Sequence, residues 1–315
     1  MRTLPLSAFA ARELAPLLDE EAAHWRGELL WDFSEVSAAV RAGLDRRSLL
    51  GRAALAEGDP IAYCYFIQES GRAVVGSLYT AAAHRGRGHE EALLGAVLED
   101  AFSDALNERI ECQTLFSTSP TADDGFARAG FRSLTRHYLV RDLKEPIPEG
   151  GRAFELRYVR KDDLPRVADL IYESHRGSLD AILNLTYGTA AHCRSFVDTI
   201  ALRAGCGSFE SEASLIAEDG NGPLGVLLAS RLSPRAGHIC QVSVLPEAQG
   251  RGLGTALVIA ALRAFERQGH ESASLSVTVG NAPAYRLYER LGFRLRKAFG
   301  AHAWVRPPAM IELPA

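Results

Sequence analysis

Residues 242–269 read VSVLPEAQGRGLGTALVIAALRAFERQG, and this stretch limits the fold more narrowly than any other part of the chain. A short alternating run ends at Leu245, glycines follow at positions 250, 252 and 254, and apolar residues then recur with helical spacing. The stretch therefore predicts a strand, a glycine-rich loop and a helix in that order. Because the first amides of a helix lack internal partners and lie at the positive end of its dipole, we expect this loop to bind phosphate.

The spacing of the glycines distinguishes between known nucleotide-binding loops. A P-loop requires a lysine followed by Ser or Thr, and this stretch contains no lysine. A dinucleotide-binding fingerprint requires G-x-G-x-x-G, but here the third glycine comes one residue too early. A nicotinamide-dependent enzyme is therefore disfavoured, although glycine still lets the backbone take up positive φ and approach a pyrophosphate closely.

The loop resembles a signature of the GNAT superfamily of N-acetyltransferases, in which Gln or Arg is followed by two residues, Gly, one residue, and Gly or Ala. Gln249, Gly252 and Gly254 occupy these positions. The resemblance implies that the loop holds the pyrophosphate of acetyl-CoA. It also implies that backbone amides of residues 242–244 pair with the pantetheine arm and the acetyl oxygen, where the fourth strand of the fold separates from the fifth.

The segment after the helix carries a second signature of this family. Residues 272–279 alternate like a half-buried strand, and residues 281–293, NAPAYRLYERLGF, read as a short helix ended by Gly292. This helix matches the family pattern of Asn, Ala, Tyr and Gly-Phe at fixed offsets. The acetyl-CoA site that the two signatures imply comprises Val242, Ser243, Val244, Gln249, Gly250, Arg251, Gly252, Leu253, Gly254, Thr255, Asn281 and Ala284.

Acetyl transfer from a thioester to an amine needs a proton acceptor for the amine and a proton donor for the departing thiolate. By resemblance, Tyr288 would protonate the CoA thiolate, with Tyr285 as the second choice. Many relatives place a basic Glu on the fourth strand, but this strand offers only His238, Gln241 and Ser243. Glutamine cannot take up a proton, whereas histidine has an ordinary pKa of about 6.5. We therefore expect Tyr288 and His238 to be catalytic, with ordered water as the alternative base.

The acceptor pocket of this fold is built by the first two helices of a domain and the loop between them. The resemblance therefore places it over residues 172–187, where polar and aromatic side chains are dense. A carboxylate from Glu173 or Asp180 could hold an ammonium group, so we expect a small-molecule or peptide amine as the acceptor. The candidate acceptor-binding residues are Tyr172, Glu173, His175, Asp180 and Tyr187.

The first half of the chain contains an altered copy of the glycine loop within residues 84–102, HRGRGHEEALLGAVLEDAF. At an offset of 164 positions (249 minus 85), Arg85 falls on Gln249 and Glu90 falls on Gly254. A carboxylate at this position would repel a pyrophosphate, and it adds a side chain where the backbone should approach the ligand. The loop of the first half is therefore expected to have lost its function.

A second match confirms that the chain repeats one fold. The segments 126–131 (FARAGF) and 288–293 (YERLGF) agree at an offset of 162 positions (293 minus 131). Phe126 then falls on Tyr288, and a phenyl ring has no proton to donate. We therefore expect two tandem domains of the α/β (α+β) class, each with a mixed, mostly antiparallel central sheet and flanking helices. Residues 1–143 would form a degenerate structural or substrate-shaping domain, residues 144–151 a linker, and residues 152–315 the catalytic domain.

Composition narrows the class of partner. The 315-residue chain is 47% hydrophobic, which is enough apolar surface for two cores, and its net charge of −4 disfavours nucleic acid and anionic membranes as partners. No run approaches the roughly 18 apolar residues of a membrane span, so a cytoplasmic enzyme is expected. The five cysteines are scattered without a C-x-x-C pair, so neither disulfides nor a metal site is expected. A non-catalytic acyl-CoA sensor or scaffold is the alternative function, and the oligomeric state is not indicated.

Overall fold

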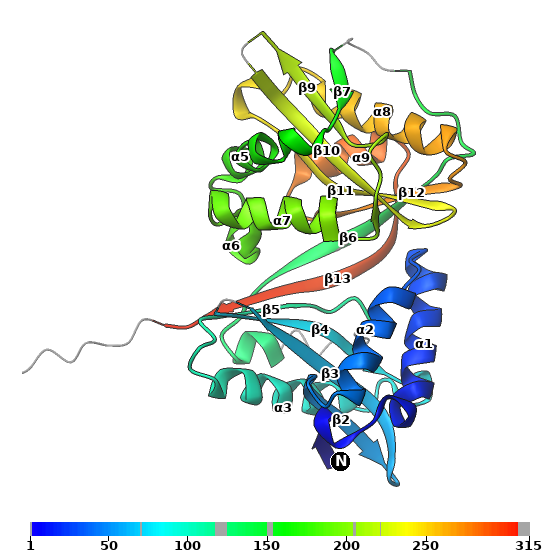
Figure 1. The fold of residues 1–315 in the computed structure, drawn as a ribbon, viewed down its shortest axis with the longest axis vertical. Helices are drawn as coiled ribbons and strands as arrows, with labels where there is room; N and C mark the ends of the chain where they lie inside the picture. The colour runs from blue at the N-terminus through cyan, green and yellow to red at the C-terminus, as the bar shows by residue number, and fades with distance from the viewer. Residues whose placement is uncertain are drawn as a thin grey trace, which may run out of the picture. The chain divides into compact units, whose positions relative to one another are not determined.

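The computed structural model of the chain describes residues 2–69, 71–116, 125–149, 154–203, 206–220 and 222–307. These residues form two compact units, each built on a mixed, mostly antiparallel sheet with helices packed against it (Figure 1). The first unit comprises Met1–Ala23, Ser34–Leu134 and Phe299–Ala315, and the second comprises His24–Phe33 and Thr135–Ala298. The fold class expected from the sequence is confirmed.

The sheet of the first unit has the strand order β1-β2-β3-β4-β5-β13. Neighbouring strands are antiparallel, except that β4 and β5 are parallel. The strands are β1 (Arg2–Pro5), β2 (Leu50–Ala56), β3 (Asp59–Glu69), β4 (Arg72–Thr80), β5 (Arg109–Gln113) and the end of β13 (Arg294–Val305), and the helices include α1 (Ala11–Leu29), α2 (Ser34–Asp45) and α3 (His89–Ser103).

Helices α1 and α3 cover opposite faces of the first sheet. Cys64 and Phe66 of β3 lie in an apolar core with Leu93 of α3. The preceding residue, Tyr63, instead donates its hydroxyl to the fully buried carboxylate of Glu21 on α1. Because successive side chains of a strand point to opposite faces, the two helices must lie on different sides of the sheet.

The sheet of the second unit has the strand order β6-β12-β11-β10-β9-β7, and the short strand β8 pairs with β10. Its strands are β6 (Arg132–Asp142), β7 (Leu156–Tyr158), β8 (Ser208–Phe209), β9 (Leu215–Asp219), β10 (Gly222–Ser233), β11 (Ala236–Val244) and β12 (Ser272–Thr278). The helices are α5 (Leu164–His175), α6 (Leu179–Leu183), α7 (Ala190–Arg203), α8 (Leu253–Arg267) and α9 (Ala282–Arg290), with short 3-10 turns between several elements.

Two apolar cores lie on the two faces of the second sheet. Val226 and Leu228 of β10 pack in a core with residues of α5 and α7. Leu227 and Ala229, which alternate with them, pack in the other core with residues of α8 and α9. The period of two along β10 therefore places α5 and α7 on one face and α8 and α9 on the other. The predicted strand, loop and helix of residues 242–269 and the short helix after residue 281 are confirmed.

The last strand of each sequence copy completes the sheet of the other unit. β6 comes from the first copy, yet it pairs with β12 of the second unit, from Asp142 opposite Ser272 to Arg136 opposite Thr278. The end of β13 pairs with β5 of the first unit, for example Ala301 opposite Gln113. The compact units therefore do not follow the sequence boundary expected at residues 144–151, of which 150 and 151 lie outside the described residues.

Two features of other protein classes are absent from the described part of the chain. Within it, no helix combines the length and the apolar character that crossing a membrane requires. The same residues contain no group of three or more His, Cys, Asp or Glu side chains placed to hold a metal ion.

Candidate active site

The strands β11 and β12 separate at the point where the site begins. They pair in parallel only from Ala236 opposite Ser272 to Ile239 opposite Leu275. Immediately afterwards β11 carries a β-bulge, because the register with β10 skips Cys240. A bulge bends a strand and increases its twist, so residues 242–244 keep β10 as a partner on one side and leave β12 on the other.

The glycine loop joins the end of β11 to the start of α8. The side chain of Gln249 donates from Nε2 to the carbonyl oxygen of Val244 at 3.0 Å, and thereby ties the loop to the strand. Gly250 has φ 73° and Gly252, which caps α8, has φ 88°, and both values lie in the left-handed region that favours glycine. The first i to i+4 bond of α8 runs from Ala256 to Gly252, so the amides before Ala256 can serve an anion.

Gly254 lies where α8 approaches its neighbours. A Cβ added there would lie 3.4 Å from Cδ1 of Leu287 on α9 and 3.9 Å from Cγ2 of Val244. These are ordinary contact distances for a methyl group, but they leave no room for a longer side chain in that direction. A small residue is therefore required at this position.

Helix α9 places Tyr288 against the same space. Asn281 caps the helix by accepting a hydrogen bond from the amide of Ala284 at 3.3 Å, and Gly292 with φ 84° ends it. The side chain of Tyr288 is buried, and burial, followed by the negative charge of Asp180, raises the pKa of its phenol well above the usual value. The phenol is therefore protonated at neutral pH and able to donate a proton.

A cavity of about 500 Å³ joins these elements. Its lining comes from β11, the glycine loop with the start of α8, the ends of α5 and α6 that follow each other in sequence, and α9. Its lining residues are Ser174, His175, Ser178, Asp180, Val242, Ser243, Val244, Ala248, Gln249, Gly250, Gly252, Leu253, Gly254, Thr255, Asn281, Pro283, Ala284, Leu287, Tyr288 and Arg290. We refer to it as the Tyr288 pocket.

The Tyr288 pocket contains most of the residues singled out from the sequence. Of the acetyl-CoA set, Arg251 alone does not line it; of the acceptor set, His175 and Asp180 line it, whereas Tyr172, Glu173 and Tyr187 do not. Tyr288 lines the pocket and His238 does not. Sequence reasoning missed Ser174, Ser178, Ala248, Pro283, Leu287 and Arg290. The spacing of Pro283, Ala284, Leu287 and Tyr288 is that of one helix face, which is a signal that would have found two of these residues.

The carboxylate of Asp180 is held inside the Tyr288 pocket. Oδ1 of Asp180, on α6, accepts a hydrogen bond from the hydroxyl of Thr278 at the end of β12. The negative charge of Asp180 also contributes to raising the pKa of Tyr288, so the two groups are electrostatically coupled. A carboxylate and a protonated phenol thus face the same cavity.

A hydrogen-bonded network supports the wall of the pocket beside Asp180. Tyr187 donates its hydroxyl to Oε1 of Gln241 at 2.9 Å, and Nε2 of Gln241 donates to the hydroxyl of Ser243 at 2.9 Å. Nε2 of Gln241 also lies 3.3 Å from Nε2 of His175, whose ring stacks on Tyr187 at 4.1 Å. Burial lowers the pKa of His175, so its ring is neutral and accepts from the amide.

His238 lies at the paired end of β11, before the bulge. Its ring stacks against Tyr138 at 6.1 Å, and its Nδ1 lies 2.9 Å from the hydroxyl of Ser274 on β12. Burial, followed by the positive charge of Arg136, lowers the pKa of His238 to about 4. The ring is therefore neutral and enclosed at pH 7, and it is separated along the strand from residues 242–244.

The first unit repeats the backbone geometry of this site. The register of β3 and β4 skips Gly76, 164 positions before Cys240 (240 minus 76), and β4 leaves β5 after Val75. Nε of Arg85 donates to the carbonyl oxygen of Thr80 at 2.9 Å, as Gln249 does to Val244. Gly86 and Gly88 have φ 71° and 79°, close to those of their counterparts.

Around the corresponding loop and bulge, the first unit carries different side chains from the second unit. Glu90, at the position of Gly254, is buried. A Cβ added at Gly76 would collide with the ring of Tyr65, so this ring lies directly against the bulge. The hydroxyl of Ser77, at the position of Gln241, donates to the buried carboxylate of Glu21. The first copy thus keeps the backbone geometry of the loop and the bulge, and has a buried carboxylate where the second copy has Gly254.

Comparison with known proteins identifies the class to which this fold and site belong. The sequence model of the Acetyltransferase (GNAT) family matches residues 13–131 and 179–293, that is, both copies. The chain therefore belongs to the GNAT family of acetyltransferases, which use acetyl-CoA as the acetyl donor. Its tandem arrangement, expected from the sequence, is confirmed.

The curated relatives that match this chain include mycothiol acetyltransferases. A mycothiol acetyltransferase of Gordonia bronchialis is 29% identical over 228 residues, which cover 66% of this chain and 72% of the relative. A mycothiol acetyltransferase of Nocardiopsis dassonvillei is 26% identical over 274 residues, 81% of this chain and 82% of the relative.

Solved structures share the fold at lower identity. A GCN5-related N-acetyltransferase from Sphaerobacter thermophilus superimposes with a TM-score of 0.62 and 21% identity over 86% of each chain. A tandem GNAT protein from the clavulanic acid biosynthesis pathway superimposes with a TM-score of 0.56 and 13% identity, over 98% of this chain and 99% of that one. At these low identities, the similarity shows that the fold is shared and nothing beyond the fold.

Proposed function

We propose that the second unit transfers the acetyl group of acetyl-CoA to a primary amine of a small molecule or peptide. The observation that carries this proposal is that one cavity is lined by the glycine loop, the separated end of β11, the phenol of Tyr288 and the carboxylate of Asp180. The acetyl donor, a proton donor and a proton acceptor can therefore meet in one place. The similarity to mycothiol acetyltransferases supports acetyl transfer as the reaction.

The glycine loop and β11 fit the two ends of acetyl-CoA. The pyrophosphate would accept hydrogen bonds from the amides of residues 250–255, where the positive end of the α8 dipole also favours negative charge. Added Cβ atoms at Gly250 and Gly252 would meet nothing within 4 Å, so the loop backbone is open to the ligand. The pantetheine arm would run along residues 242–244, where β12 no longer occupies that side of β11.

Asp180 and Tyr288 are suited to the two proton transfers. In the proposed reaction the amine nitrogen attacks the thioester carbon, a C–N bond forms and the C–S bond breaks. Asp180 accepts the proton that the amine loses, and Tyr288 gives its phenolic proton to the departing thiolate. His238, the base expected from the sequence, has no part in this scheme because it is buried outside the pocket.

The network of Tyr187, Gln241 and His175 would shape the acceptor end of the pocket. Because Nε2 of His175 accepts from Gln241, its lone pair is already used, and His175 is assigned a positioning role. Tyr187 lies outside the lining but holds the amide of Gln241 in place.

Paired variants test the proposed roles of the carboxylate and the phenol. We expect Asp180→Asn and Tyr288→Phe each to lower kcat for CoA thiol release about 10²- to 10⁴-fold, with little effect on the Kd of acetyl-CoA. Glu173→Gln and Tyr172→Phe are matched controls, because both residues lie outside the pocket and should leave kcat unchanged. The assay combines a panel of amines with thiol detection, and isothermal titration measures acetyl-CoA binding.

The two measurements also separate the proposed enzyme from an acyl-CoA sensor. Tight acetyl-CoA binding without thiol release for any amine would favour the sensor. An Asp180→Asn variant with normal kcat at pH 7 would remove Asp180 from the mechanism, and ordered water would then be the expected base.

A further inference from the structure

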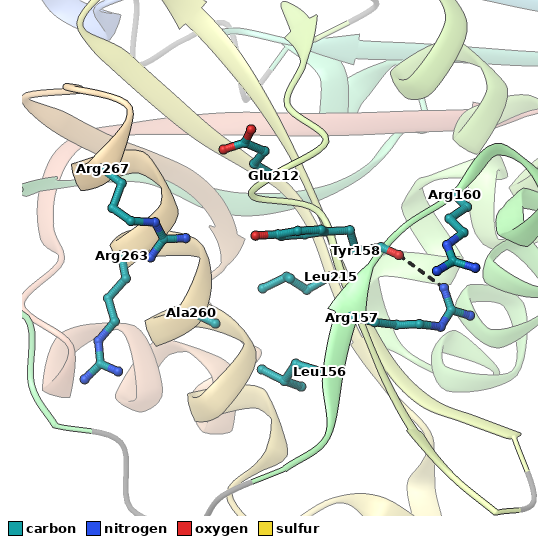
Figure 2. Close-up of a pocket in the computed structure, with 9 residues that line it drawn as sticks. All are labelled: Leu156, Arg157, Tyr158, Arg160, Glu212, Leu215, Ala260, Arg263 and Arg267. Atoms are coloured by element: carbon teal, nitrogen blue, oxygen red, sulfur yellow. Dashed lines mark hydrogen bonds between the residues drawn. The ribbon is translucent and has the colours of Figure 1, made fainter.

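A second cavity, of about 590 Å³, lies further along α8, between this helix, the edge strand β7 and the start of β9 (Figure 2). It shares no lining residue with the Tyr288 pocket. The first turn of α8 thus faces one cavity and its later turns face another. The lining residues are Leu156, Arg157, Tyr158, Arg160, Glu212, Leu215, Ala260, Arg263 and Arg267, and we call this cavity the arginine pocket.

Two arginines of α8 form the cationic wall of the arginine pocket. Arg263 and Arg267 lie one helical turn apart, both are exposed, and neither forms an ion pair within the described part of the chain. Like charges at this spacing destabilise a helix. Arg267 lies in the last turn, where the helix dipole favours a cation, but Arg263 lies a turn earlier and gains less. An anion between the two guanidinium groups would relieve their repulsion.

The other arginines of the lining turn away from this wall. Figure 2 shows the side chains of Arg157 and Arg160 extending from the β7 side away from α8. Arg157 is also fully engaged, because it bonds to Asp163 at 2.6 and 2.8 Å and to Glu218 at 2.6 and 2.7 Å. The net positive charge that faces a ligand therefore comes from Arg263 and Arg267, opposed at the rim by the exposed carboxylate of Glu212.

The floor of the arginine pocket is apolar. Leu156, Leu215 and Ala260 line it, and the ring of Tyr158, 51% exposed, lies above them with its hydroxyl toward α8 (Figure 2). Leaving this ring in water forgoes the free energy that its burial would provide. A ligand with an apolar body would cover both the ring and the floor.

We propose that the arginine pocket binds a small organic anion, in which a phosphate or carboxylate group is attached to an aromatic or other apolar body. The anionic group would accept hydrogen bonds from Arg263 and Arg267, whose planar guanidinium groups match both anions. The body would lie on Leu156 and Leu215 and against the ring of Tyr158. An inorganic anion would leave the floor exposed, and a neutral aromatic molecule would leave the guanidinium groups unpaired, so both parts of the ligand are needed.

Titration with 1-naphthyl phosphate tests this site, with acetyl-CoA at saturation so that the Tyr288 pocket is filled. We expect binding that weakens about tenfold in Arg263→Gln and in Arg267→Gln, because each variant removes a charge-assisted contact. Tyr158→Ala should also weaken it. Arg203→Gln is the matched control, because Arg203 is an exposed arginine in the last turn of α7 that lines neither pocket, and it should leave the affinity unchanged.

Probes with one part removed complete the test. Inorganic phosphate and 1-naphthalenemethanol should each bind more weakly than 1-naphthyl phosphate, and competition by 1-naphthoate shows whether a carboxylate serves as well as a phosphate ester. The proposal is overturned if 1-naphthyl phosphate does not bind, if it binds equally to the double variant Arg263→Gln/Arg267→Gln, or if saturating acetyl-CoA displaces it. None of these outcomes bears on acetyl-CoA binding or thiol release, which are measured separately.

Discussion

At the scale of single residues, His238 shows how position along one strand decides what a side chain can do. It lies on the strand that leads into the site, but it precedes the bulge at Cys240 and is enclosed by Tyr138 and Ser274. Asp180 has no place in the sequence signatures, yet the hydroxyl of Thr278 holds it in the pocket with Tyr288. Proximity in sequence to the glycine loop therefore does not decide which side chains line the pocket.

Burial of His238 predicts a pH dependence of stability. Its pKa falls from an ordinary value of about 6.5 to about 4 in the folded chain, so between these values the unfolded state binds more protons. The contribution of His238 to the free energy of unfolding is thus fully present above pH 6.5. It is lost as the pH decreases from 6.5 toward 4, which lowers the free energy of unfolding by about 3 kcal/mol. Histidine C2–H resonances in an NMR titration measure the pKa directly.

A midpoint near pH 6.5 for His238 would contradict this prediction and would show that the ring reaches solvent. His302 in the first unit serves as an internal comparison, because burial also lowers its pKa to about 4. The C2–H resonance that is missing from the spectrum of the His238→Gln variant belongs to His238, which distinguishes it from the resonance of His302.

At the scale of elements, the start of α8 predicts how the loop responds to substitution. Gly254→Ala adds a methyl group at contact distance from Leu287, so we expect the Kd of acetyl-CoA to change less than about tenfold. Gly254→Glu places a carboxylate beside the pyrophosphate, and such charges a few ångströms apart repel by roughly 4 kcal/mol at an effective dielectric constant of 20. We expect a loss of affinity on the order of 10³-fold by isothermal titration.

Circular dichroism and thermal unfolding provide the control for Gly254→Glu, since a misfolded variant would also fail to bind. Affinity that is unchanged in a folded Gly254→Glu protein would show that the pyrophosphate lies elsewhere.

The sequence predicted well those elements whose signals lie within one short stretch of the chain. The glycine loop, α8 and α9 follow from glycine spacing, caps and apolar periodicity within about 50 residues, and the structure confirms them. The part of the Tyr288 pocket that α5 and α6 line was predicted only in part. Asp180 and His175 are held there by contacts with Thr278 and Gln241, which lie far away in sequence. The exchange of β6 and β13 depends on pairing between copies and leaves no local signal.

At the scale of the whole molecule, the two copies predict how many acetyl-CoA molecules bind. Both copies keep the bulge and the left-handed glycines, but in the first unit the buried carboxylate of Glu90 stands at the position of Gly254. We therefore expect isothermal titration to give one acetyl-CoA per chain, and no binding event of comparable affinity in Gly254→Glu. A remaining binding event in that variant would show that the first unit also takes up acetyl-CoA.

The exchanged strands have a consequence for the way the protein is made. Ala301 pairs with Gln113, 188 positions earlier (301 minus 113), so the first sheet lacks its final strand until the residues of β13 have left the ribosome. The edge of β5 stays open during this time, which slows folding and invites wrong pairings. The same exchange ties the copies together in evolution, because deleting the first would remove β6 from the unit that carries Tyr288. A copy whose glycine loop has Glu90 in place of the last glycine can thus be inherited as an indispensable part of its neighbour.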